Sequence, residues 1–412
     1  MTSPESSPST LPAALLRTLD RWLDDGPDGP LVRLLGRALD EDGVPREWPV
    51  EDWWPVLECL ERARKARRSP WPEPLLAVLE RFFLAALRFS RHGGASPFGT
   101  GPAEDRSALL KSWAKQVSDP TLAAVVDRWF PRRGAGPGIP ALPAYASVER
   151  PLAVLRPDWN AHGDLLAIDH RRPEGCRFSV IGRGQAWLGP GWEGSQSEVG
   201  SGPRPRPRGW QTGAYADFYE WSFASPGGRK ERTAVLLRGR GMALIAEQAG
   251  AEAAFRVGIP PGVKARPVEG SRGLILSPSR GGSARLWPIG LSAMPSAGEG
   301  FGIDGGSISY TKRFEGRRGW LPMLISWDAD RNRRPAHWRP LTVTEDRKVC
   351  RDDRAVAWRV SWGREETLVV YRSLGRPASR CFLGHQTKGG TRFLMAEFDD
   401  DGDFRPLLTV MA

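Results

Sequence analysis

The chain has 412 residues and a formal net charge of +11, with 40% hydrophobic and 26% charged residues. This composition is typical of a globular protein, the length favours two domains, and no run of about 18 apolar residues that could span a membrane occurs. The N-terminus lacks a basic stretch followed by an apolar one, so we expect no signal peptide and a cytoplasmic location.

The positive charge is concentrated in the second part of the chain. Residues 1–144 contain 19 basic and 19 acidic residues, whereas residues 145–412 contain 40 basic and 29 acidic ones. The second part is therefore the one expected to meet an anionic partner. The four cysteines are far apart and lack metal-ligand spacing, which predicts reduced thiols, no metal site and no cofactor.

The first third of the chain predicts helices. Residues 1–10 are rich in Ser and Pro and are expected to be disordered. Within residues 11–133, apolar residues recur at helical spacing in six segments, at 15–23, 31–39, 53–60, 75–87, 109–117 and 122–130. Asp28-Gly29-Pro30 and Asp119-Pro120 suit helix starts, and the short links favour antiparallel helical hairpins.

A Pro/Gly-rich linker is predicted at residues 134–144, and helical periodicity ends there. Residues 145–412 instead show short alternating segments separated by turn signals, at 165–169, 219–223, 233–237, 242–247, 307–313, 355–362, 366–371, 393–398 and 404–410. Regular short strands of this kind predict a large antiparallel β-sandwich. The predicted fold class is therefore α+β multidomain, with an all-α domain of helical hairpins followed by a β-sandwich.

The stretch from 167 to 192, AIDHRRPEGCRFSVIGRGQAWLGPGW, has the most distinctive pattern. His170 follows a short predicted strand, and the next residues to alternate between apolar and polar are 177–181. Gly182-Arg183-Gly184 then predicts a turn. A histidine and a carboxylate at the start of such a hairpin can hold a sugar or move a proton.

This stretch resembles the histidine-led signature of the heparinase II/III-like polysaccharide lyases. The signature contains a His, an acidic residue, an aromatic strand, a Gly turn and a Pro-Gly, and these places are filled by His170, Glu174, Phe178, Gly184 and Pro190-Gly191. Arg172 stands where the family often has a second His. Segments 338–345, 370–374 and 380–384 also look like the family's sandwich tails. The resemblance implies that the helices form a partial α/α toroid.

The resemblance also implies a reaction, β-elimination next to a uronic acid. The substrate carboxylate is neutralised, a base removes the neighbouring proton, and an acid protonates the leaving oxygen. His170 would act as the base or the neutralising group, and a sandwich tyrosine such as Tyr215 or Tyr219 would be its partner. Ligand binding would involve Arg171, Arg172, Glu174, Trp192 and Trp210.

Two features indicate a degenerate lyase site. The family carries its Tyr acid on the toroid, whereas residues 1–144 contain no tyrosine, and six helices are too few for a full toroid. The first hypothesis is therefore a protein that recognises an acidic polysaccharide or another polyanion. An active lyase is the second, and nucleic-acid binding, supported only by basic charge and aromatic residues, is the third. No membrane partner is expected, and the sequence leaves the oligomeric state open.

Two local alternatives also stay open. His170 fits a structural histidine at a strand edge as well as a site residue. The repeat PRPRPR at 203–208 predicts either a stiff extended segment that displays Arg204, Arg206 and Arg208 or a disordered insertion.

Overall fold

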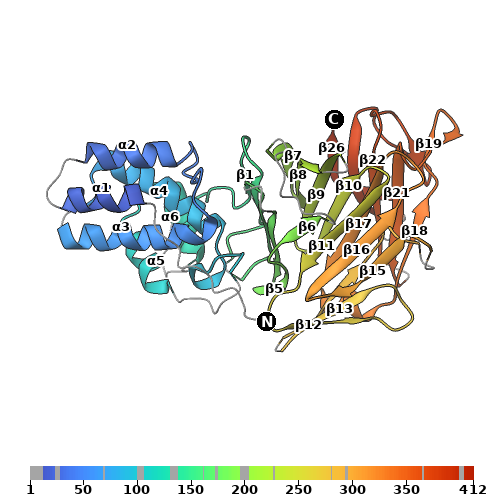
Figure 1. Ribbon diagram of the computed structural model, residues 1–412, viewed down its shortest axis with the longest axis horizontal. Helices are drawn as coiled ribbons and strands as arrows, with labels where there is room; N and C mark the ends of the chain where they lie inside the picture. The colour runs from blue at the N-terminus through green and yellow to red at the C-terminus, as the bar shows by residue number, and fades with distance from the viewer. Residues whose placement is uncertain are drawn as a thin grey trace. The chain divides into compact units, whose positions relative to one another are not determined.

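The computed structural model describes residues 13–23, 28–67, 70–99, 106–129, 138–160, 162–171, 175–194, 204–225, 228–279, 281–292, 296–363, 366–398 and 403–412. The chain divides into two compact units, which we call the helical unit and the β unit (Figure 1). The helical unit comprises Met1–Pro143 with Trp159–His162, and the β unit comprises Ala144–Asp158 with Gly163–Ala412. The predicted disordered start, residues 1–10, and residues 134–137 of the predicted linker lie outside the described residues.

The helical unit has α-helices at the six places where the apolar spacing predicts them. They are α1 (Ala13–Leu23), α2 (Gly29–Ala38), α3 (Trp53–Arg67), α4 (Glu73–Arg88), α5 (Ser107–Ala114) and α6 (Pro120–Trp129), with short 3-10 turns η1 (Val50–Asp52) and η2 (His92–Gly94). Their apolar faces form a core rich in tryptophan, in which the Trp71 ring stacks 5.2 Å from Trp22 and 6.3 Å from Trp113. Periodicity therefore predicted these helices because each buries one apolar stripe.

The acidic residues at the two predicted helix starts, Asp119 and Asp28, have different roles. Asp119 caps α6, since its carboxylate accepts hydrogen bonds from the backbone N–H groups two and three residues later, at 2.7 and 3.1 Å. Asp28 precedes α2 but makes no side-chain cap. Its carboxylate instead accepts from the Trp22 indole at 2.7 Å and lies 3.3 Å from Arg67, so it ties α1 to α3.

The largest element of the β unit is an eight-stranded antiparallel sheet, which we call the central sheet. In spatial order its strands are β12 (Val263–Pro267), β13 (Leu274–Pro278), β14 (Ala284–Trp287), β17 (Gly319–Ser326), β10 (Met242–Ala249), β9 (Gly228–Leu237), β8 (Ala216–Ser225) and β7 (Arg206–Thr212). The edge strands β12 and β7 therefore lie at opposite sides of the sheet, as Figure 1 also shows.

Four smaller antiparallel sheets complete the β unit. The first sheet has β1 (Tyr145–Ala146), β2 (Leu152–Leu155), β3 (Leu165–Asp169), β4 (Arg177–Gly182) and β5 (Gln185–Leu188). The side sheet has β15 (Glu299–Asp304), β16 (Ser307–Arg313), β11 (Glu252–Gly258) and β6 (Trp192–Gly194). The outer sheet has β18 (Ala336–Leu341), β21 (Ala355–Trp362), β22 (Glu366–Ser373), β25 (Thr391–Phe398) and β26 (Phe404–Met411). The cap sheet has β20 (Lys348–Val349), β19 (Thr344–Glu345), β23 (Cys381–Phe382) and β24 (His385–Gln386).

The β unit differs from the predicted sandwich because the central sheet is buried on both faces. On β9, Ala234 and Leu236 belong to a core shared with the first and side sheets, whereas Val235 and Leu237 belong to a core shared with the outer sheet. A further apolar cluster lies between the outer and cap sheets. The unit is therefore a stack of sheets with more than two layers. It also contains α7 (Ala329–Arg333), a short helix that the sequence pattern did not predict.

A buried carboxylate joins the central sheet to the outer sheet. Glu220 of β8 has no exposed surface, and its carboxylate oxygens lie 2.6 Å from the Arg372 guanidinium and 2.9 Å from that of Arg392. Arg372 belongs to β22 and Arg392 to β25, both in the outer sheet. Removing one partner of a buried ion pair costs far more than removing an exposed one, because the remaining charge stays out of water.

We expect Glu220→Gln to lower the free energy of unfolding of the β unit by about 3 kcal/mol, because it leaves two arginines without this carboxylate. The matched control is Asp330→Asn, which removes a carboxylate paired with Arg333 at 3.4 Å on the surface and should hardly change stability. Urea unfolding of both variants gives the comparison. Equal effects of the two substitutions would contradict the structural role of Glu220.

Candidate functional site

His170 lies immediately after β3, at the place where the sequence predicts the site. Its backbone N–H donates to the Pro151 carbonyl at 2.8 Å, which continues the pairing of β3 with β2 by one residue. The residue is 2% exposed, so the side chain lies within the β unit rather than on its surface. The local fold thus places the histidine at a strand edge but turns it inward.

The imidazole of His170 is held as a neutral hydrogen-bond acceptor. The Trp221 indole donates to Nδ1 at 3.0 Å, so the neutral ring carries its proton on Nε2. Burial, and secondarily the positive charge of Arg232, lower the pKa of His170 to about 3. The Phe223 ring lies 5.1 Å away. At neutral pH this histidine is therefore uncharged and a weak base.

A row of buried side chains across the central sheet supports this histidine. Trp221 of β8 stands opposite Arg232 of β9, which stands opposite Glu247 of β10. Arg232 and Glu247 are both fully buried, and the guanidinium lies 3.1 Å from the carboxylate. Lys230 reaches the same carboxylate at 2.9 Å. Glu247 thus balances the charge of Arg232 beside the histidine.

Aromatic rings enclose the Arg232 guanidinium on the side of the first and side sheets. Its central carbon lies 4.9 Å from the Trp192 ring centroid and 4.5 Å from that of Phe223. Trp192 also packs edge-on against Trp221 at 5.5 Å. Cation–π contacts of this kind are strengthened by desolvation. Trp192, predicted as a ligand-binding residue, has no exposed surface and instead forms this enclosure.

The two predicted catalytic tyrosines have different environments. Tyr219 stacks on Trp221 with ring centroids 5.6 Å apart, is fully buried, and has a pKa raised well above its usual value, chiefly by burial. Tyr215 is 46% exposed and precedes β8. It is six residues from Trp221, which corresponds to roughly 20 Å along an extended strand. The structure therefore brings Tyr219, but not Tyr215, to the surroundings of His170.

Of the remaining predicted ligand-binding residues, the structure describes Arg171 and Trp210. Arg171 makes a bidentate pair with Asp169, at 2.9 and 2.8 Å, and both side chains are 7% exposed. Trp210 lies opposite Tyr219 on β7 and is half-buried against the same core. Arg172 and Glu174 lie outside the described residues. Asp169, the residue before His170, therefore has Arg171 as its charged partner.

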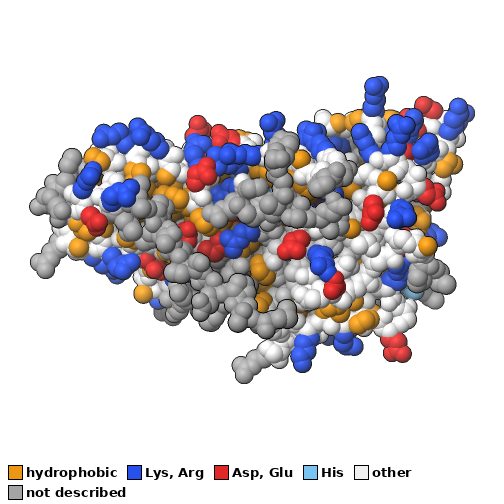
Figure 2. All heavy atoms as spheres, viewed as in Figure 1, with side chains coloured by type: hydrophobic (Ala, Val, Ile, Leu, Met, Phe, Trp, Pro, Cys, Tyr) orange, Lys and Arg blue, Asp and Glu red, His pale blue; other side chains and the backbone are white. Residues whose placement is uncertain are grey.

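The PRPRPR repeat forms part of an ordered edge strand. Arg206 and Arg208 lie on β7, with a bulge between Pro207 and Gly209, and Arg204 precedes the strand. All three arginines are exposed. Figure 2 shows Lys and Arg side chains gathered along the upper margin of the face of the β unit that it draws. The edge strand therefore displays its charge to solvent, as the extended alternative predicts.

Two absences concern only the part of the chain that the structure describes. No group of three or more His, Cys, Asp or Glu side chains there could hold a metal ion. None of the described helices is long and apolar enough to cross a membrane.

Sequence reasoning missed Arg232, which acts on His170, and its partners Glu247 and Lys230. Their signal is weak but present: Lys230 and Arg232 occupy the same face of β9 as Ala234 and Leu236, so the apolar side of the strand begins with two cations. Charges on an apolar face require buried partners. The partner, Glu247, lies on another strand and could not be assigned from sequence.

We expect His170 to make stability depend on pH. Above about pH 6.5 the ring is neutral in both states, whereas below it the unfolded chain takes up a proton that the folded protein refuses until about pH 3. The free energy of unfolding should therefore fall by about 1.4 kcal/mol per pH unit in this window through His170 alone. His170→Asn keeps an acceptor for Trp221 and should remove this contribution. Urea unfolding between pH 7.5 and 4.5 measures both slopes.

The control for this experiment is His337→Asn, the same change at an exposed position of the β unit. Its slope should match that of the unmodified protein. If His170→Asn and the unmodified protein lose stability in parallel between pH 6.5 and 4.5, His170 is not held neutral.

Comparison with known proteins identifies the fold. No protein-family model matches the chain, and no curated protein matches it in sequence. Among solved structures, the heparan sulfate lyase HepC from Pedobacter heparinus superposes with a TM-score of 0.64 at 13% identity, covering 86% of this chain and 63% of that protein. A heparinase III gene product gives a TM-score of 0.60 at 12% identity, covering 89% of this chain and 66% of its own length.

The chain thus spans less than two thirds of the length of these two lyases. The likeness extends over both helices and antiparallel sheets, at low sequence identity. The heparinase resemblance expected from the stretch around His170 is therefore confirmed at the level of the fold: this is a divergent chain with the fold of the heparinase III lyases.

Proposed function

We propose that this protein recognises an acidic, uronate-containing polysaccharide or a related anionic ligand and that its lyase site is degenerate. One observation carries the proposal: the histidine at the place of the family signature is 2% exposed, with Nδ1 occupied by the Trp221 indole. The fold is typical of polysaccharide lyases, whereas the buried environment of His170 suits a structural role rather than a catalytic one.

The chemistry of β-elimination supports this interpretation. An efficient general acid or base has a pKa near the working pH and reaches the proton that it transfers. The pKa of His170 is lowered to about 3, and that of Tyr219 is raised well above its usual value. At neutral pH the histidine is a poor base and the phenol a poor acid. Both groups are also buried, so neither contacts a polymer on the surface of the β unit.

Recognition of an anion is supported by the exposed charge of β7. Arg204, Arg206 and Arg208 alternate with prolines, which limit the conformational freedom of the segment before binding. Arg206 and Arg208 lie two residues apart on β7 and both side chains are exposed, so the strand presents two positive charges close together. In this proposal the helices α1–α6 form a partial α/α toroid, as the resemblance implies.

An active lyase remains the second candidate function, because HepC, which has a similar fold, is named a heparan sulfate lyase. In that case His170 would act with Tyr219 or Tyr215 after a rearrangement that exposes the histidine. Nucleic-acid binding remains the third, and steep salt dependence without preference for sugar composition would favour it.

Incubation with a panel of uronate polysaccharides tests recognition against cleavage. We expect binding to at least one acidic polymer, with no growth of the ultraviolet absorbance that the unsaturated product of elimination would give. The reason is that the buried, neutral His170 is not placed to transfer a proton. Growth of absorbance that His170→Asn abolishes would replace the proposal by the active-lyase alternative.

Substitution of the three β7 arginines tests the recognition surface. The triple variant Arg204→Ala, Arg206→Ala, Arg208→Ala should weaken binding of the acidic polymer at least about tenfold at low salt and flatten its salt dependence, because exposed charges are screened by ions. Affinity measurements at two salt concentrations provide the test.

The matched control removes three exposed positive charges elsewhere on the β unit, with Arg317→Ala, Arg347→Ala and Arg351→Ala. It lowers the net charge equally but should leave affinity within about twofold. Equal losses in the two triple variants would mean that the polymer responds only to total charge, against a specific surface on β7.

A further inference from the structure

A cavity of about 440 Å³ lies within the β unit, at the edge of the central sheet opposite β7. Its walls are the β12–β13 turn at residues 268–272, Arg285 and Trp287 of β14, and the segment from Arg333 to Trp338 that links α7 to β18. The volume falls in the usual range for sites that hold small ligands. The cavity contains none of the residues that the heparinase signature indicates.

The aromatic walls of this cavity are fixed by contacts behind them. The Trp338 indole donates to the Leu291 carbonyl at 3.0 Å, and Trp287 packs edge-on against Trp362 with ring centroids 5.4 Å apart. Both tryptophans belong to the core between the central and outer sheets. The cavity floor is therefore preorganised, which reduces the entropy lost on binding.

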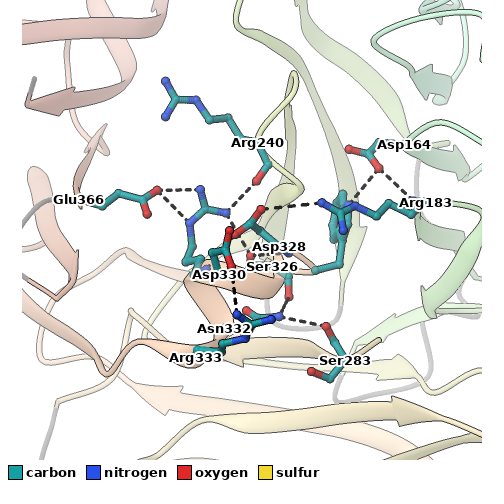
Figure 3. Close-up of polar contacts among 12 residues, drawn as sticks. Asp164, Arg183, Arg240, Ser283, Ser326, Asp328, Asp330, Asn332, Arg333 and Glu366 are labelled. Atoms are coloured by element: carbon teal, nitrogen blue, oxygen red, sulfur yellow. Dashed lines mark hydrogen bonds and ion pairs between the residues drawn. The ribbon is translucent and has the colours of Figure 1, made fainter. Parts of the chain in front are cut away.

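The rim formed by α7 is fixed as well (Figure 3). The Arg331 guanidinium donates two hydrogen bonds to the Glu366 carboxylate, at 2.9 and 2.7 Å. The Asn332 amide donates to the Ser283 carbonyl at 3.0 Å. These contacts hold the backbone immediately before Arg333. The Arg333 side chain itself is 78% exposed. Arg333 is thus an exposed cation on a fixed backbone, and its guanidinium lies 3.4 Å from the Asp330 carboxylate.

The charge of the lining favours an anion. Three arginines, Arg272, Arg285 and Arg333, face one carboxylate, Glu269. Arg272 is already neutralised by Glu299 at 2.7 Å. Among the described residues Arg285 has no carboxylate within ion-pair distance, although it is half-buried. Burial and the neighbouring Arg266 both lower its pKa, so an anion placed beside it would relieve an unfavourable positive charge.

We propose that this cavity is a second anion site that holds the carboxylate or sulfate group of one acidic sugar unit, with Arg285 as its main partner and Arg333 at its rim. An arginine fork matches both groups through paired, charge-assisted hydrogen bonds. The class of ligand rests on the proposed function, whereas the preference for an anion rests on the cavity itself.

The second site is separate from the surroundings of His170. Arg285 lies on β14, and three strands, β17, β10 and β9, stand between β14 and β8, which carries Trp221. At about 4.8 Å per strand this is roughly 19 Å. Trp287, on the same face of β14 as Arg285, belongs to the core on the outer-sheet side, whereas Trp221 belongs to the core on the other side. One sugar unit cannot contact both places.

Calorimetric titration of the full chain with three disaccharides tests the proposal: one with a uronate and no sulfate, one sulfated without a uronate, and neutral cellobiose. We expect at least one acidic disaccharide to bind and cellobiose not to bind, and the two acidic probes separate the carboxylate from the sulfate. Arg285→Gln should weaken binding at least about tenfold, since it removes the paired charge-assisted contacts. Arg333→Gln should weaken it about twofold to threefold, because that side chain stays in solvent.

A steric variant keeps the test independent of charge. Ser271→Trp places a large ring in the cavity mouth and should abolish binding of the disaccharide, with the melting temperature of each variant measured to verify folding. Arg317→Gln, an exposed arginine outside the cavity, is the charge control and should change nothing. Absence of binding by either acidic disaccharide, or equal affinity in Arg285→Gln and the unmodified protein, would overturn the second site.

The two proposals fail in different ways. The triple variant of Arg204, Arg206 and Arg208 should weaken binding of a long acidic polymer but leave disaccharide affinity unchanged. Loss of disaccharide binding in that variant, with retention in Arg285→Gln, would place the anion at β7 and remove the second site. Disaccharide binding without polymer binding would retain the second site and contradict the proposed function.

Discussion

Two buried carboxylates, one on each face of the central sheet, are the constraint on which the β unit depends. Glu220 and Glu247 both have no exposed surface, and each is held by cations that are themselves buried or nearly so. A buried carboxylate without such partners would carry a desolvation penalty of several kcal/mol. The cations on the Glu220 side come from the outer sheet, so this pairing fixes the register between two layers as well as their distance.

The Glu247 side of the sheet determines the state of the candidate site. Its carboxylate balances Arg232, and Arg232 in turn raises the cost of a second positive charge on His170. The Trp221 indole then occupies the nitrogen that a general base would need. The arrangement that stabilises the fold is thus the one that makes His170 neutral and poorly suited to proton transfer.

The same architecture leaves cationic groups at two separate places on the central sheet, on the edge strand β7 and on the inner strand β14. At β7 the arginines are exposed on a strand stiffened by prolines, whereas Arg285 of β14 is half-buried and lines a partly open cavity with rigid aromatic walls. An exposed row of charges suits a long polymer, since it gains from many weak, screened contacts. A half-buried arginine in a cavity suits a single group, since some water is displaced and the contact is stronger. Part of the net charge of +11 thus lies on two surfaces of different kinds, the exposed arginines of β7 and the cavity lined by Arg285.

The sequence alone determined the elements whose burial is local. Apolar spacing located the six helices, alternation located strands such as β3, β16 and β21, and the stretch from 167 to 192 indicated the heparinase resemblance. The same stretch contains both His170 and Trp192, whereas Tyr219 was named with Tyr215 only because the resemblance implies a sandwich tyrosine, and tertiary packing places it near His170. A continuous apolar run such as that of β17 is consistent with a strand covered on both faces, but it does not identify the sheets that cover it.

Only the tertiary structure decided which side chains are charged partners. Arg232 meets Glu247, Glu220 meets Arg372, and Arg285 meets no carboxylate among the described residues, although all are ordinary charged residues in sequence. Their contacts join strands separated by many residues, and no periodicity encodes such a pairing. The state of His170 depends on these contacts because a pKa is set by burial and nearby charges in three dimensions. Sequence therefore located the histidine, and the packing of distant strands determined its chemistry.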